Sequence, residues 1–85
     1  MFSEVVMLDK NKKQITKDSL LLYYPYSDAR VLVAKIRSIE YNFPNIQYST
    51  IILADNWRRN PYEVEVVTNN EIMILMLEGT IKEIR

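Results

Sequence analysis

One loop in this 85-residue chain gathers the side chains that most often make contacts with other molecules. Trp57, Arg58 and Arg59 follow one another, and Tyr62 comes shortly after them. An indole beside two guanidinium groups can stack on bases and bind phosphate, as single-stranded nucleic-acid sites do. The same residue types also dominate protein–protein contact sites. A third, structural interpretation is that Trp57 folds onto the sheet edge while the arginines pair with nearby carboxylates.

A second group of charges lies near the N-terminus, where Lys10, Lys12 and Lys13 form a small basic turn between residues 9 and 13. Three lysines supply little electrostatic binding by themselves. The turn therefore fits a solvated hairpin loop, or an additional phosphate contact if the Trp57 loop binds nucleic acid.

Composition excludes most catalytic and metal chemistry. The chain has no histidine, no cysteine and a single glycine, which removes the commonest general base, thiolate metal sites and glycine-rich phosphate loops. Glu63 and Glu65 are spaced to form a carboxylate pair on one strand face, but such residues need no catalytic explanation there. We expect no enzymatic activity, no cofactor, no metal and no small-molecule substrate.

The longest segment with a helical period covers residues 28–43. An apolar residue recurs every three or four positions along it, which places one stripe on one helix face. That stripe consists of Ala29, Leu32, Ile36, Ile39 and Phe43. Ser27 or Asp28 can cap the first turn, and Pro44 would end the helix. The pattern predicts a helix over about 28–43 that packs on a sheet.

The segments 62–68 and 71–77 read as a β-hairpin with Asn69-Asn70 as its turn. One of its faces would pack under the helix, and the other would carry an apolar patch interrupted by Glu63 and Glu65. That patch consists of Val67, Ile72, Ile74 and Met76. Since one helix covers only one face of a sheet, either the sheet curls over the patch or another protein chain covers it.

Together these segments predict a single α+β domain over residues 1–85. One helix would lie on a mainly antiparallel sheet of about five strands, which could be strongly curled. Residues 17–24 fit either a helical turn capped by Thr16 or a strand over 20–24, and we expect the strand. No apolar run approaches the ~20 residues of a membrane helix. The segment Met1–Leu8 lacks the basic start of a signal peptide, so we expect a cytoplasmic protein without membrane association.

These observations favour a small, non-catalytic protein-interaction module. Its contacts would be the apolar sheet face and the loop of Trp57, Arg58, Arg59 and Tyr62, and its partner a second copy or another protein. In size and composition the chain resembles small α+β proteins of viruses and mobile elements, which implies a host protein as partner. The alternative is a nucleic-acid-binding module that uses Trp57-Arg58-Arg59 and the Lys10–Lys13 turn.

Overall fold

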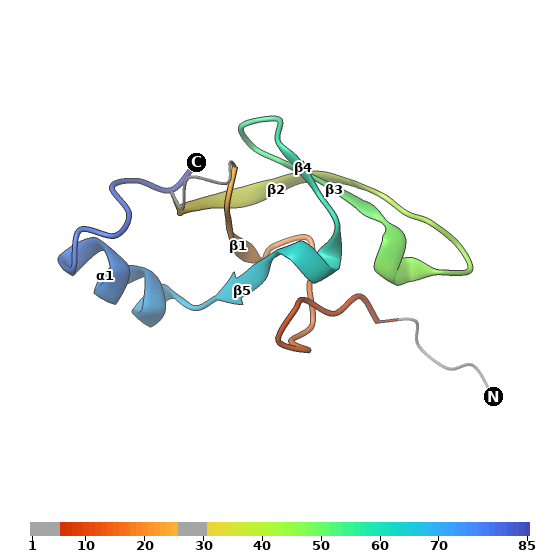
Figure 1. Cartoon of the computed structure of the whole chain (residues 1–85), viewed down its shortest axis with the longest axis horizontal. Helices are drawn as coiled ribbons and strands as arrows, with labels where there is room; N and C mark the ends of the chain where they lie inside the picture. The colour runs from red at the N-terminus through yellow and green to blue at the C-terminus, as the bar shows by residue number, and fades with distance from the viewer. Residues whose placement is uncertain (1–5, 26–30) are drawn as a thin grey trace.

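A computed structural model describes residues 6–25 and 31–85 of the chain (Figure 1). Within these residues, five strands form one antiparallel sheet in the order β4-β3-β2-β1-β5. The strands are β1 (Leu20–Tyr23), β2 (Leu32–Glu40), β3 (Thr50–Leu53), β4 (Arg58–Arg59) and β5 (Glu65–Val67). One α-helix, α1 (Asn69–Leu77), and two 3₁₀ turns, η1 (Ile46–Tyr48) and η2 (Pro61–Glu63), complete the described elements. The predicted class, one helix with a five-stranded antiparallel sheet, is confirmed, and the sheet is neither closed nor strongly curled.

The position predicted for the helix is wrong. Residues 32–40 form β2, the longest of the described strands, and residues 26–30 lie outside the described residues. The first half of β2 pairs with β1, from Leu32 opposite Tyr23 to Lys35 opposite Leu20. The second half pairs with β3, from Ile36 to Glu40. β2 therefore links the two halves of the sheet.

A bulge in β2 explains why its sequence has a helical period. Leu32 and Ile36 lie an even number of residues apart and contact the same core cluster, as alternation in a strand requires. The pairing with β3 then shifts register between Ile36 and Ser38. The bulge adds one residue to β2 and so reverses the side to which each following residue points. Ile39, three residues after Ile36, therefore contacts the same cluster as Ile36. The spacing of three and four residues thus arises within an extended strand.

The predicted hairpin over residues 62–77 is also wrong, because its second half is α1. Thr68 caps the helix: its hydroxyl accepts a hydrogen bond from the Glu71 N–H at 3.1 Å, while the Glu71 carboxylate accepts from the Thr68 N–H. At the other end Gly79 adopts φ +77° and donates to the Met76 carbonyl, and Thr80 donates to the Leu75 carbonyl. This Schellman arrangement ends the helix.

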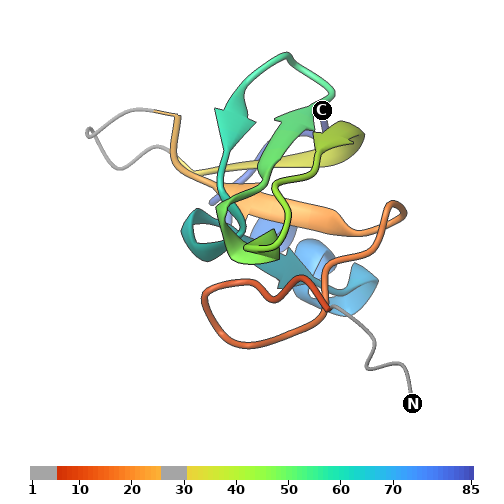
Figure 2. The ribbon, with the colours of Figure 1, turned by 90° about the vertical axis from the view of Figure 1, so that its right-hand side faces the viewer.

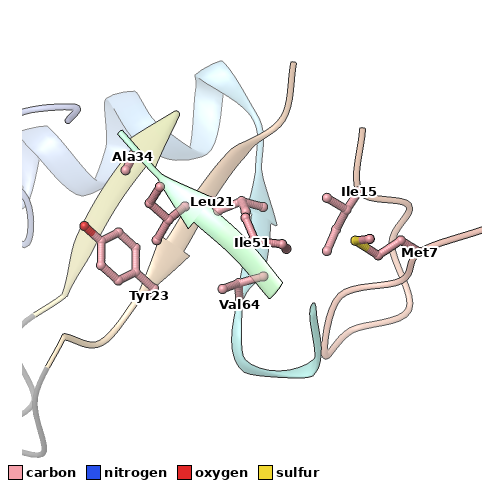
Figure 3. Packing of buried hydrophobic residues seen from close by; sticks show 8 residues of the cluster. Met7, Ile15, Leu21, Tyr23, Ala34, Ile51 and Val64 are labelled. Atoms are coloured by element: carbon pink, nitrogen blue, oxygen red, sulfur yellow. The ribbon is translucent and has the colours of Figure 1, made fainter. Parts of the chain in front are cut away.

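The two faces of the sheet carry separate hydrophobic clusters. β1 contributes to both, because Leu21 and Tyr23 point to one face and Leu20 and Leu22 to the other. The larger cluster also receives Met7 and Ile15 from the N-terminal segment (Figure 3). Its buried members are Met7, Ile15, Leu21, Tyr23, Ala34, Ile51, Leu53 and Val64.

The smaller cluster fixes α1 to the rest of the molecule. Its buried members are Leu22, Val33, Val67, Ile72 and Ile81. Only Ile72 of the α1 residues is buried, and Leu75 is half-buried beside it. The helix therefore has one narrow inner side, and most of its circumference faces outward.

The molecule is elongated, with extents of 46 × 24 × 19 Å. α1 lies at one end of the long axis, and the connection from β2 to η1 extends to the opposite end (Figure 1). Figure 2 looks along this axis from the η1 end and shows α1 behind the sheet.

Candidate functional site

The structure divides the predicted loop of Trp57, Arg58, Arg59 and Tyr62 between inward and outward positions. Trp57 is half-buried and packs against the larger cluster, and the Arg59 guanidinium lies 5.1 Å from the indole centroid. Arg59 also donates hydrogen bonds to the Tyr24 carbonyl at 2.8 Å and the Pro25 carbonyl at 3.0 Å. Arg59 thus links β4 to the residues that follow β1, while Trp57 packs on the core beside it.

The two exposed members of that loop make contacts of their own. Arg58 forms an ion pair with Glu40 at 3.4 Å. The Tyr62 ring lies edge-on to Tyr48 at 6.1 Å between centroids, and its hydroxyl donates to the Asn60 side chain at 3.2 Å. The four residues do not form one stacking platform, and a binding role for them stays a prediction.

Two lysines of the Lys10–Lys13 turn are paired within the chain. Lys10 contacts Glu65 at 3.1 Å, and Lys13 contacts Glu71 at 3.8 Å. The turn itself is fixed by the buried Asp9, whose carboxylate accepts backbone hydrogen bonds from Asn11, Lys13 and Val66. The lysine charges are therefore partly balanced before any phosphate approaches.

The possible acid pair is not assembled. Glu63 accepts a hydrogen bond from the Asn60 N–H and so completes the capping box of η2, whereas Glu65 pairs with Lys10. Within residues 6–25 and 31–85, no cluster of three or more acidic side chains is placed to hold a metal ion. None of the described helices is long and apolar enough to cross a membrane.

A polar network joins Arg85 to the sheet through Asp55 and Tyr23. The fully buried Tyr23 donates its hydroxyl hydrogen bond to Asp55, and Arg85 lies 3.4 Å from the same carboxylate oxygen. Burial, followed by the hydrogen bond to Asp55, raises the pKa of the Tyr23 hydroxyl well above its ordinary value. Because Tyr23 is fully buried, its hydrogen bond to Asp55 stabilises the fold.

The apolar sheet face predicted over residues 67–76 does not form, because 69–77 is helical. Val67 and Ile72 are buried in the smaller cluster, whereas Ile74 and Met76 are exposed on α1. The helix turns successive residues by about 100°, so it separates residues that a strand would have placed on one face.

The outer side of α1 instead carries a continuous apolar surface, which we name the α1 ridge. Its four members are Met73, Ile74, Met76 and Leu77, with exposed fractions of 61%, 54%, 40% and 85%. Met73 and Leu77 are four residues apart and lie on adjacent turns, so their side chains extend one surface. The sequence prediction missed these two residues, although the capping pattern Thr68-x-x-Glu71 was a readable signal for a helix.

A shallow groove runs beside the α1 ridge. It has a volume of about 260 Å³ and lies between α1, β1 and β5. Its lining residues are Leu22, Glu65, Val67, Glu71, Ile74 and Leu75. Ile74 belongs to both features, so the ridge and the groove adjoin, and two of the residues that line the groove, Glu65 and Glu71, are acidic.

Comparison with known proteins gives no match to a protein-family model, a curated protein or a solved structure. A function for the chain therefore has to follow from its own surface and contacts.

Proposed function

We propose that this chain is a small, non-catalytic protein-interaction module that binds its partner through the α1 ridge. The observation that carries the proposal is the exposure of four large aliphatic side chains on one nine-residue helix. Helices with apolar residues on all sides are usually covered by other protein or by lipid, and extended exposed apolar patches mark contact sites.

Contacts within the described fold do not explain why the residues of the α1 ridge are apolar. Ile72 and Leu75 make the inner contacts of α1, whereas the Leu77 side chain is almost fully exposed. Complete burial of one such aliphatic side chain is worth about 1.5–3 kcal/mol. A partner that covers the ridge would recover part of this free energy for each of the four residues.

The pairing of the cations supports a protein partner over nucleic acid. Arg58, Lys10 and Lys13 contact carboxylates, and Arg59 is bonded to backbone carbonyls. Binding to a polyanion would have to compete with these contacts, whereas apolar contact on the α1 ridge leaves them intact.

Photo-crosslinking tests the proposal directly. A photoreactive amino acid replaces Leu77 in the chain, which is expressed in the organism that encodes it. A control variant carries the same amino acid in place of Tyr41, an exposed residue away from α1. We expect an adduct with a protein from position 77, none from position 41, and loss of the adduct when Met73→Lys is added. Equal adducts from both positions, or none from position 77, would contradict the proposal.

A further inference from the structure

The methionines of the chain lie in very different surroundings. Met73 and Met76 belong to the α1 ridge and are 61% and 40% exposed, whereas Met7 is 5% exposed within the larger cluster. Met1 lies outside the described residues. The chain has no cysteine, so the methionine thioethers are its only sulfur groups. A dissolved oxidant therefore reaches two of these sulfurs directly, and both are on the surface that we propose as the contact site.

We infer that Met73 and Met76 make the α1 ridge a redox-sensitive contact surface, and that a peroxide oxidises both residues and so prevents the partner from binding. The inference rests on the proposed function of the α1 ridge and adds its regulation. Oxidation of a sulfur side chain depends on the access of the oxidant, so the two exposed thioethers should react before the buried one.

The reaction transfers one oxygen atom to each sulfur. A lone pair of the thioether sulfur attacks one oxygen of hydrogen peroxide, the O–O bond breaks and an S–O bond forms. The other oxygen takes up the proton of the first and leaves as water. Sulfur thereby loses two electrons, which the peroxide gains. Methionine sulfoxide reductases reverse the change with electrons from thiols, so the modification is not permanent.

The sulfoxides would interrupt the α1 ridge at its centre. Met73 is three residues before Met76 and four residues before Leu77, so the three side chains are neighbours on the helix surface. A sulfoxide oxygen accepts hydrogen bonds from water, and an apolar partner surface offers no replacement for them. Burial of such a polar group without a hydrogen bond is unfavourable. Oxidation therefore opposes the contact that the apolar thioether favours.

Oxidation at these two positions leaves the inner side of α1 unchanged. Ile72 and Leu75 fix the helix to the smaller cluster, and neither residue contains sulfur. The capping box at the start of the helix consists of Thr68 and Glu71. Because neither Met73 nor Met76 is among the buried core residues, the oxidised chain should keep its fold and lose only its apolar outer surface.

The first test measures which methionines react. The purified chain is treated with dilute hydrogen peroxide, and the oxygen gained at each methionine is followed by mass spectrometry of its peptides. We expect Met73 and Met76 to be oxidised at least about tenfold faster than Met7, because oxidation of the buried sulfur needs an opening of the fold. The midpoint of urea unfolding should not change while only the two exposed sites are oxidised. Equal rates at all three sites, or unfolding at this stage, would overturn the inference.

The second test measures the contact itself. The chain with a photoreactive amino acid in place of Leu77 is oxidised, freed of peroxide and illuminated in a desalted extract of the organism that encodes it. We expect the yield of the protein adduct to fall at least about tenfold. Treatment of the oxidised chain with methionine sulfoxide reductase and a thiol should restore the adduct.

A chain that carries both Met73→Leu and Met76→Leu is the matched control. Leucine has nearly the volume and helix preference of methionine but no sulfur. The adduct from position 77 should therefore form with this control chain and survive the peroxide treatment. Loss of the adduct to the same extent in the control chain would place the sensitive group elsewhere and overturn the inference.

The outcomes separate this inference from the proposed function. An adduct that forms before oxidation and persists after both methionines are oxidised overturns the redox inference alone. An adduct that oxidation removes and the reductase restores supports both. The absence of any adduct from the untreated chain overturns both, because the ridge then has no contact to regulate.

Discussion

The two ends of the molecule both expose large hydrophobic side chains, but they do so differently. At the end opposite α1, Tyr41 stacks on Phe43 with 5.8 Å between ring centroids, and Tyr48 meets Tyr62 edge-on. These rings cover one another in part, and tyrosine hydroxyls can remain in water. The aliphatic side chains of the α1 ridge have no polar group. The comparison teaches that exposure alone does not define a contact surface; what the exposed groups already contact also matters.

Substitutions on the inner and outer sides of α1 should differ most in their effect on stability. Ile72→Ala should lower the free energy of unfolding by about 2–5 kcal/mol, because Ile72 is buried in the smaller cluster. Leu77→Ala should change the stability of the monomer by less than about 0.5 kcal/mol, because Leu77 is exposed. Urea unfolding measures both. Equal losses would show that the ridge is part of the folding core.

The buried Tyr23 provides a contrast to the exposed tyrosines of the opposite end. Tyr23→Phe should cost about 1–2 kcal/mol, since it removes the donor to Asp55. The raised pKa of Tyr23 means that the folded state holds the proton more tightly than the unfolded chain, where the pKa is about 10. Stability should therefore be intact below about pH 10 and fall above it.

Urea unfolding at several pH values between neutrality and strong alkali measures this dependence. Tyr23→Phe should show a weaker decline in stability above about pH 10 than the unmodified chain. An identical decline in both would exclude Tyr23 as its source.

The capping box of α1 links helix stability to the ridge. Thr68→Ala removes the acceptor for the Glu71 N–H and should cost about 1 kcal/mol. Thr68→Ser retains a hydroxyl acceptor and is the matched control. Because fraying of α1 would disturb the ridge, Thr68→Ala should also weaken the photo-crosslink from position 77. A change in stability without any change in that crosslink would separate the ridge from the helix.

The aromatic end should show the smallest effects. Tyr62→Ala removes the edge contact with Tyr48 and the hydrogen bond to Asn60, both at an exposed site, and should cost about 0.5–1 kcal/mol. Tyr62→Phe retains the ring and should cost less. Neither variant should change the photo-crosslink from position 77. A loss of that crosslink in either variant would place the contact surface at this end of the molecule.

Sequence reasoning located some elements well and others not at all. The apolar run at residues 20–24 predicted β1, which spans Leu20–Tyr23, because a short run that is apolar on both faces suits an inner strand. Residues 69–77 were assigned to a hairpin because Asn-Asn resembles a tight turn. The local signals for α1 were nevertheless present, in Thr68 with Glu71 before the helix and Gly79 after it.

The candidate site was predicted only in part, because the segment that carries it is a helix where the sequence pattern predicts a strand. Ile74 and Met76 were identified as exposed apolar residues, and the structure exposes both, on a helix in place of a strand. Met73 and Leu77 fall on the hairpin face that is predicted to pack under the helix, because side chains alternate between the two sides of a strand. When a helical segment is interpreted as a strand, half of the residues that it exposes are therefore assigned to the core.

The sequence by itself determined the α+β class, the end signals of α1, and the absence of histidine, cysteine and glycine-rich chemistry. These properties depend on composition and on residues close together in the chain. Only the tertiary structure decided that residues 32–40 are a strand, because their spacing fits a helix and a bulged strand alike. Pairing with β1 and β3, which lie on either side of β2 in the sequence, stabilises the strand. The positions of Trp57 and Arg59 and the exposure of the α1 ridge depend likewise on contacts between distant segments, which no local pattern encodes.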